Sequence, residues 1–176
     1  MALDILEKLR AAVRDVPDFP KKGIIFKDIT PVLSDPGLFR ASIDLFLERC
    51  QGKDVDKIVG IDARGFIFGS AVAYELGVGF VPIRKRGKLP YRTDVAKYSL
   101  EYGEAEVEMH IDAVTKGERV VLVDDLLATG GTSAAAAVLI RNAGADLLEA
   151  QFLIELAFLE GRKRLEPTPV TSFLKY

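Results

Sequence analysis

One stretch of the sequence, residues 120–132, constrains the fold more than any other. It reads VVLVDDLLATGGT: four apolar residues, two adjacent carboxylates (Asp124 and Asp125), and a glycine-rich turn before an alanine-rich segment. Such an apolar run is typical of a strand buried on both faces of a parallel sheet. Open α/β sheets bind ligands at the carboxyl ends of their strands, and a helix that starts after glycines favours an anion. The stretch therefore predicts a sugar-phosphate site, with carboxylates for hydroxyl groups or Mg²⁺ and amides for phosphate.

The rest of the chain alternates apolar runs with helical patterns, which is typical of βαβ units. Helices are expected at about 3–15, from near Ser34 to Cys50, at about 66–76 and at about 131–143. After a short apolar piece at 24–26, strands are expected at 57–61, 80–83, around 107–111, at 119–123 and at 148–156. Right-handed crossovers then place helices on both faces of a parallel sheet. The predicted class is α/β, with a Rossmann-like sheet in one domain.

Composition excludes several classes of protein. The chain of 176 residues carries 24 basic and 26 acidic side chains, which argues against a nucleic-acid binder. Cys50 is the only cysteine and His110 the only histidine, so neither an internal disulfide nor a zinc site is expected, and any metal is held by oxygen. Charges near the N-terminus argue against a signal peptide, and no apolar run has the length of a membrane span. We expect a cytoplasmic protein that binds neither membrane nor nucleic acid.

The segment from residue 84 to residue 105 is unusual. Residues 84–97 hold six basic side chains against one acidic, whereas residues 98–113 hold five acidic side chains and no lysine or arginine. A long polar stretch without a strong period, inside a compact α/β chain, is more typical of a functional lid than of an idle connection. Its basic part is compatible with a solvated loop, a nucleic-acid patch or a pyrophosphate site.

The 120–132 stretch resembles the phosphoribosyl pyrophosphate (PRPP) motif of the type I phosphoribosyltransferases. Four further segments resemble the adenine-specific members of that family: Phe19-Pro20 with GIIFKDITPVL at 23–33, GIDARGFIFG at 60–69, IRKRGKLP at 83–90 and YSLEYG at 98–103. The resemblance covers most of the chain in the family's order. It implies a single domain, 1–176, in which about 1–35 include a small hood that recognises the base and about 84–106 form a basic loop and a flexible lid.

The resemblance implies that adenine and PRPP react to give AMP and pyrophosphate, in purine salvage, with Mg²⁺ bound through PRPP. The family's motif then assigns Asp124 and Asp125 to the ribose hydroxyls, where either carboxylate also helps to stabilise positive charge on the ring and contacts Mg²⁺ through water. The 5′-phosphate is assigned to the turn that holds Ala128, Thr129, Gly130, Gly131 and Thr132.

Pyrophosphate is assigned to two places. One is the turn with Ala63 and Arg64, where relatives often carry serine or another small residue in place of Ala63 and where a strained peptide is common. The other is the basic loop with Arg84, Arg86 and Lys88, which in type I relatives often reaches a neighbouring subunit's site. The resemblance therefore implies a homodimer, without deciding which of the three basic residues acts. Without it, Arg64 also fits a solvated loop.

Adenine is assigned to main-chain groups of Ile25, Phe26 and Lys27, with Leu126 packed on a face of the base. Many relatives have valine for Ile25 and arginine for Lys27, which changes little if the contacts are main-chain. Glu101 is the predicted general acid/base, since a carboxyl that reaches N7 helps the ring to lose or share its proton. Tyr98 and Tyr102 flank it and are expected to close over the site. Without the resemblance, the sequence favours Glu101 as one of five acids on a solvated face.

Several alternatives remain at this point. The 120–132 stretch also fits an ordinary strand-to-helix turn with an aspartate cap, although adjacent acids after an apolar strand are costly without a ligand. The base is alternatively hypoxanthine, xanthine or a pyrimidine, or the chain is a PRPP-sensing regulator without catalysis. Cys50 is expected in the core, and His110, near a strand start, is expected to be structural.

Overall fold

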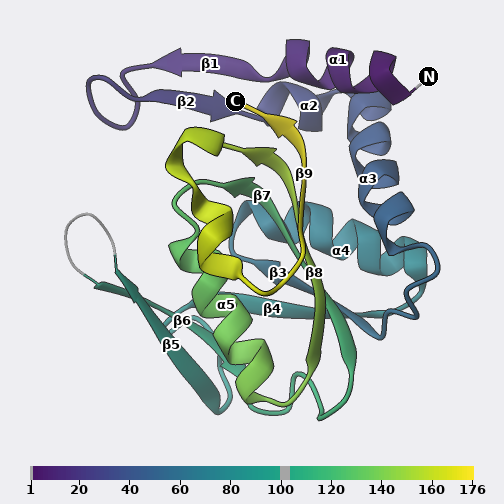
Figure 1. The fold of residues 1–176 in the computed structure, drawn as a ribbon, viewed down its shortest axis with the longest axis vertical. Helices are drawn as coiled ribbons and strands as arrows, with labels where there is room; N and C mark the ends of the chain where they lie inside the picture. Colours follow the sequence, from purple (N-terminus) through teal and green to yellow (C-terminus); the bar gives the residue numbers. More distant parts are fainter. Residues whose placement is uncertain (1, 100–103) are drawn as a thin grey trace. The chain divides into compact units, whose positions relative to one another are not determined.

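The computed structural model describes residues 2–99 and 104–176, which adopt an α/β fold (Figure 1). The chain divides into two compact units, Met1–Glu48 and Arg49–Tyr176. Within the described ranges, the first unit holds a sheet of two strands and the second a sheet of seven. None of the helices in these ranges is both long enough and apolar enough to cross a membrane.

The N-terminal unit consists of short elements. In chain order they are α1 (Ala2–Ala12), β1 (Arg14–Pro17), β2 (Ile25–Asp28), α2 (Thr30–Ser34) and most of α3 (Pro36–Cys50). The expected helix at 3–15 is wrong beyond residue 12, where the chain turns into β1 and pairs antiparallel with β2. Pairing of Arg14–Pro17 with Ile25–Asp28 takes these residues out of the helix. The predicted start of α3 is confirmed, because Asp35 Oδ1 accepts a hydrogen bond of 2.8 Å from the Leu38 amide.

The C-terminal unit is a mixed, mainly parallel sheet between helices. Its elements are β3 (Lys57–Ile61), α4 (Arg64–Leu76), β4 (Gly79–Lys85), β5 (Thr93–Ser99), β6 (Glu104–His110), β7 (Arg119–Leu127), α5 (Gly131–Asn142), β8 (Asp146–Glu155), the 3₁₀ turns η1 (Ala157–Leu159) and η2 (Gly161–Leu165), and β9 (Val170–Lys175). The strand order is β5-β6-β4-β3-β7-β8-β9. Helices α4 and α5 cover opposite faces, α5 in front and α4 behind (Figure 1). The predicted two-sided sheet is confirmed.

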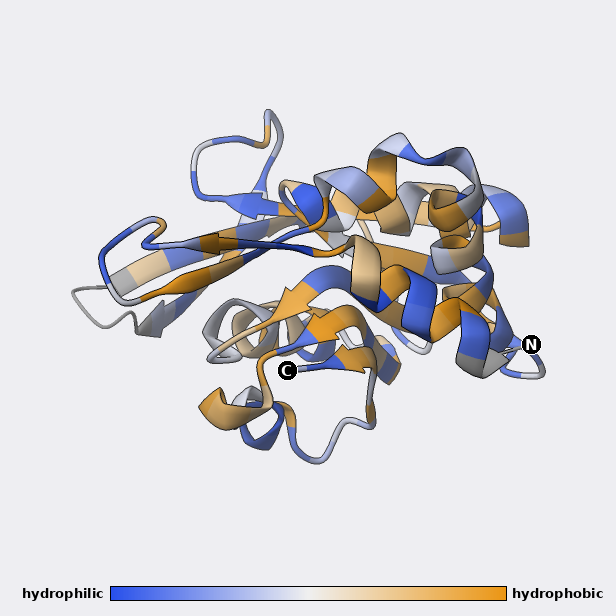
Figure 2. Cartoon of the chain, turned by 90° about the horizontal axis from the view of Figure 1, so that it is seen from above, coloured by the Kyte–Doolittle hydropathy of each residue, from blue (hydrophilic) through white to orange (hydrophobic). Residues whose placement is uncertain are grey.

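The middle of this sheet is the apolar core. In Figure 2 several strands carry orange, hydrophobic stretches beside blue ones, and the long loops are mainly blue or pale. Val121 and Leu122 of β7 are fully buried, as the VVLV run predicts. Strand β7 pairs in parallel with β3 on one side and β8 on the other. The residues that follow β3 and those that end β7 therefore meet at one edge of the sheet.

Residues 84–105 differ most from expectation. Much of this segment is strand: β5 and β6 pair antiparallel as a hairpin, and β6 pairs antiparallel with β4. The period of β5 is hidden in the sequence because this strand lies at the sheet edge, where charged side chains are favoured and Val95 is 40% exposed. His110 ends β6, so the expectation that it lies near a strand start is wrong. Strand β9 also carries no clear sequence signal.

Candidate functional site

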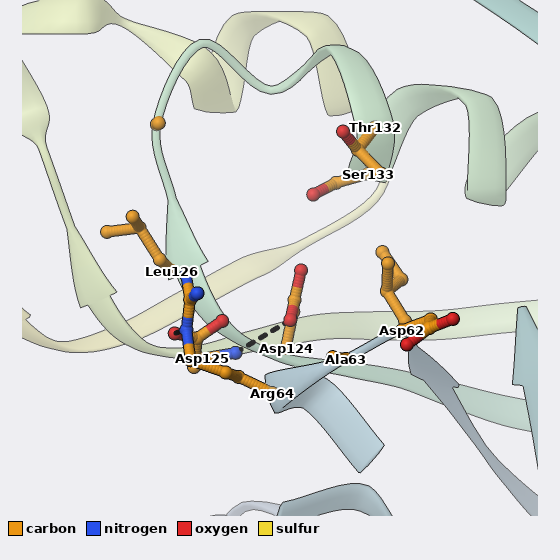
Figure 3. A pocket seen from close by; sticks show the side chains of 10 residues that line it. Asp62, Ala63, Arg64, Asp124, Asp125, Leu126, Thr132 and Ser133 are labelled. Atoms are coloured by element: carbon orange, nitrogen blue, oxygen red, sulfur yellow. Dashed lines mark hydrogen bonds and ion pairs between the residues drawn. The ribbon is translucent and has the colours of Figure 1, made fainter. Parts of the chain in front are cut away.

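A pocket of about 220 Å³ opens where β3 and β7 end (Figure 3). Three segments of chain supply its wall: the end of β3 with the turn that follows, the end of β7 with the loop that follows, and the first turn of α5. The lining residues are Ile61, Asp62, Ala63, Arg64, Asp124, Asp125, Leu126, Ala128, Thr132 and Ser133. The two motifs singled out from the sequence, 60–69 and 120–132, thus share one pocket.

An ion pair joins the two motifs. Arg64 Nε lies 2.5 Å from Asp125 Oδ2. The Asp125 side chain is 7% exposed, whereas that of Arg64 is 45% exposed, so the guanidinium remains open to solvent and to a ligand. The pair places one positive charge against a buried carboxylate, beside the second carboxylate of the pocket, Asp124.

Asp124 has the most perturbed electrostatics in the pocket. Its carboxylate points toward the start of α5 (Figure 3) and accepts a hydrogen bond of 2.9 Å from the Asp125 amide. Burial, followed by the negative charge of Asp125, raises the pKa of Asp124 well above its ordinary value of 3.8. Asp124 therefore holds a proton at higher pH than an exposed aspartate. A carboxyl group of this kind can donate a hydrogen bond as well as accept one.

Glycines permit close approach on both sides of the pocket. A Cβ at Gly65 would lie 2.6 Å from Asp124 Oδ1, so only glycine lets the turn after β3 approach β7. Gly130 has a φ of +79° and is the N-cap of α5, where the first helical amides have no intrahelical acceptor. With Thr132 and Ser133 at the pocket wall, this turn has amide and hydroxyl groups that can donate to an anion.

The basic loop is held by acidic partners. Arg84 Nε lies 2.9 Å from Asp62 Oδ2 in the pocket wall, whereas Arg86 pairs at 2.6 Å with Glu106 on β6. Lys88 is exposed, and its amide donates to Glu108 Oε1 at 2.9 Å. Of the three predicted basic residues, the structure brings Arg84 to the pocket wall through Asp62 and engages Arg86 elsewhere.

Glu108 is a residue that sequence reasoning missed. It is 3% exposed and also accepts hydrogen bonds from the Leu89 amide, at 2.8 Å, and from the Thr93 hydroxyl, at 3.1 Å. Burial alone would raise its pKa, but amides led by that of Leu89 outweigh burial and lower the pKa. Glu108 thus fixes the turn that carries the basic residues. In the sequence it is one of three alternating acids, Glu104, Glu106 and Glu108, and this pattern does not show which of them is buried.

The remaining predicted residues have these positions. Ile25, Phe26 and Lys27 lie on β2 in the N-terminal unit, where Lys27 Nζ pairs with Asp15 at 2.5 Å. Tyr98 lies on β5 and packs against the core. Glu101 and Tyr102 lie outside the described residues. Leu126 and Ala128 line the pocket, and the Asp62–Ala63 peptide bond is cis.

His110 and Cys50 make structural contacts. His110 Nε2 accepts a hydrogen bond of 3.4 Å from the Tyr91 amide, and the two rings meet edge to face. Cys50 is buried, as expected, near the Gln151 amide. Ile61, Asp62 and Ser133 were missed as pocket residues, although Asp62 and Ser133 are each next to a residue that was predicted.

Comparison with known proteins places the chain in a family. The model of the phosphoribosyl transferase domain matches residues 30–172. The adenine phosphoribosyltransferase of Anaeromyxobacter dehalogenans is 56% identical over 172 residues, which are 98% of this chain and 100% of that protein. The chain belongs to the adenine phosphoribosyltransferase family.

Solved structures of this family agree with the fold. The adenine phosphoribosyltransferase of Thermoanaerobacter pseudethanolicus is 51% identical and superposes with a TM-score of 0.95, covering 97% of this chain and 99% of that one. The enzyme of Saccharomyces cerevisiae, solved with adenine and an imino-altritol bisphosphate, is 43% identical with a TM-score of 0.94, covering 98% and 99%. The fold is therefore that of the type I phosphoribosyltransferases.

Proposed function

We propose that this chain transfers the phosphoribosyl group of PRPP to adenine, forming AMP and pyrophosphate in purine salvage. The observation that carries the proposal is the single pocket in which two carboxylates, Arg64 and the glycine-rich turn meet. It is supported by membership of a family whose S. cerevisiae member was solved with adenine and whose Trypanosoma brucei member was solved with AMP, pyrophosphate and ribose 5-phosphate.

The pocket suits the chemistry of this transfer. The bond between C1 of the ribose and pyrophosphate breaks as N9 of adenine bonds to C1, so positive charge develops on the ring and negative charge on the leaving group. We assign Asp124 and Asp125 to the ribose hydroxyls, with their negative charge close to the ring, and assign the turn from Ala128 to Thr132 to the 5′-phosphate.

Arg64 can exchange its partner, the Asp125 carboxylate, for a ligand. Without ligand its guanidinium neutralises Asp125, and about half of its side chain faces solvent. Pyrophosphate oxygens that bind this guanidinium replace the Asp125 carboxylate, which then becomes available to a ribose hydroxyl. Ala63, Arg84, Arg86 and Lys88 complete the proposed pyrophosphate side. This arrangement links binding of the leaving group to binding of the sugar.

Mg²⁺ fits this donor set through the substrate. In the parts of the chain that the structure describes, no three His, Cys, Asp or Glu side chains gather closely enough to hold a metal by themselves. Oxygen donors from PRPP would complete the shell, with Asp124 and Asp125 as the neighbouring carboxylates. The ion would supply positive charge that neutralises pyrophosphate as it leaves.

The base and the lid are assigned as the family's pattern implies. Ile25, Phe26 and Lys27 offer main-chain groups to adenine, and Leu126 packs on the base. Glu101 acts as general acid/base at N7, and Tyr98 and Tyr102 close the lid. We also propose a cytoplasmic homodimer. A single, buried, free cysteine is compatible with a reducing compartment, and sedimentation velocity tests the dimer.

The test is nucleotide formation with Mg²⁺, PRPP and one purine at a time. We expect AMP from adenine and at least about 100-fold lower kcat/KM with hypoxanthine, because hypoxanthine has a carbonyl where adenine has an amine. Equal turnover of hypoxanthine would reject the adenine assignment. Binding of PRPP without turnover of any base would instead favour the sensing regulator.

A further inference from the structure

A second backbone segment lies directly against the turn assigned to the 5′-phosphate. A Cβ added to Gly161, the first residue of η2, would lie 2.2 Å from the Ala128 carbonyl oxygen and 2.9 Å from the Gly130 amide nitrogen. Conversely, a Cβ added to Gly130 would lie 2.3 Å from the Gly161 carbonyl oxygen. Two glycines from segments some 30 residues apart therefore allow two backbones to touch.

Gly161 is required by this contact and not by its own conformation. Its φ lies outside the left-handed range, so another residue could adopt the same backbone. The residue before it, Glu160, has a φ of +53°, which is uncommon for a side chain of this kind. The chain thus accepts an unfavourable conformation at Glu160 in order to bring Gly161 against the turn.

An ion pair anchors this segment to the sheet. Arg162 donates two hydrogen bonds to Glu155 at the end of β8, of 2.7 and 2.5 Å, and the hydroxyl of Ser172 on β9 donates to the same carboxylate. Glu155 is only 2% exposed. The hydrogen bond from Arg162 lowers the pKa of Glu155, so the pair stays charged at neutral pH. A bidentate arginine of this kind fixes direction as well as distance.

The other end of η2 is anchored in the core. Leu165 is fully buried in the hydrophobic cluster of the sheet, and η2 packs against α5, the helix that begins at the turn. Gly161 is therefore held by the residues that follow it, with Arg162 paired to Glu155 and Leu165 in the core. The turn it touches has glycines at two of its five residues and would otherwise sample many conformations.

We infer that Gly161 and the Glu155–Arg162 pair are positioning residues that hold the turn from Ala128 to Thr132 in the shape that binds the 5′-phosphate. The inference rests on the proposed function of that turn. Amides held in place before a ligand arrives bind more tightly, because the ordering of the loop has already taken place. Loss of this support should weaken the binding of ligands that carry a 5′-phosphate and leave the binding of free pyrophosphate unchanged.

The first test is Gly161→Ala. We expect KM for PRPP and Kd for ribose 5-phosphate, measured by calorimetry, to rise about tenfold or more, as when an aligned contact shifts by an ångström. KM for adenine and Kd for pyrophosphate should change less than about twofold, which a loss of stability alone would not produce. Gly144→Ala is the control: Gly144 follows α5 at its far end and has a φ of +82°, so this variant loses stability while both Kd values stay constant.

The second test keeps the inference falsifiable if Gly161→Ala fails to fold. Arg162→Lys keeps the positive charge but loses the two parallel hydrogen bonds to Glu155. We therefore expect a smaller rise in Kd for ribose 5-phosphate, of about threefold, with Kd for pyrophosphate again unchanged. Folded variants that bind ribose 5-phosphate as the wild type does, or that lose both ligands equally, would overturn the inference. The calorimetry needs no turnover, so a wild type that binds ribose 5-phosphate but makes no AMP would reject the proposed function alone.

Discussion

Replacing Asp124 by asparagine should make the protein more stable and less active. Two carboxylates share the pocket with one guanidinium, and burial and Asp125 raise the pKa of Asp124. Two neighbouring like charges in a protein repel by a few kcal/mol at an effective dielectric constant of about 20. Arg64 and partial exposure reduce this repulsion, so the asparagine should stabilise the fold by about 1–2 kcal/mol. For a chain of this size, the expected rise in Tm is about 2–8 °C.

The pH dependence of the gain in Tm distinguishes repulsion between the two carboxylates from a general stabilising effect of asparagine. Since the folded pKa of Asp124 lies above the unfolded one, the folded state holds more protons between the two values, and wild-type stability falls as pH rises through that window. The gain in Tm from Asp124→Asn should therefore be near zero at about pH 4 and reach its maximum above the folded pKa.

The assay is a series of calorimetric scans from acid to alkaline pH, with Asp94→Asn, at an exposed position of β5, as the matched control. A variant that is less stable than the wild type at every pH, or whose gain does not change with pH, would refute the reasoning. AMP formation by Asp124→Asn should fall at least about 100-fold, because a group that acts on the transition state is lost.

Three further predictions concern acidic residues. Glu108→Gln should weaken pyrophosphate binding about threefold to tenfold in calorimetry, since amides such as that of Leu89 lose a charged acceptor worth about 1 kcal/mol; unchanged binding would remove Glu108 from the support of the basic loop. Glu149→Ala should lower Tm by about 6 °C or more, because this buried carboxylate accepts from Lys53 at 2.5 Å and breaking a buried pair costs about 3 kcal/mol; kcat at 25 °C should not change. Glu101→Ala should lower kcat about 100-fold or more while PRPP binding survives, and an unchanged kcat would exclude Glu101 from the chemical step.

The sequence predicts best those strands that are buried on both faces of the sheet. The 57–61 strand agrees residue for residue with β3, because an unbroken apolar run in a folded chain is usually buried. The strand expected at 119–123 has the right start, but β7 continues through the two aspartates to Leu127. The end of α1 was missed because Val13 and Val16 continue the helical spacing, while strand pairing with β2 decides the outcome. The edge strand β5 was missed because its exposed face is polar.

The candidate site was predicted as a set of residues but not as a set of contacts. The motifs place Arg64 and Asp125 in one site, yet their ion pair depends on the register between β3 and β7, which no local pattern contains. Gly161 shows the same limit more strongly. Its neighbours in the sequence look like an ordinary turn, and the reason for the glycine lies with Ala128 and Gly130.

The pairing of β3 with β7 has a consequence for synthesis on the ribosome. Strand β3 and its partner β4 are separated by one helix, α4, but the strand on the other side of β3, β7, follows only after α4, β4, β5 and β6. At about 5–20 residues per second, the roughly 60 intervening residues take about 3–12 s to emerge. During that interval the open, apolar edge of β3 lies in the nascent chain without its partner. The pocket that unites Arg64 with Asp125 is therefore assembled late, and chaperone binding to the emerging chain is expected to concentrate on the 57–61 segment.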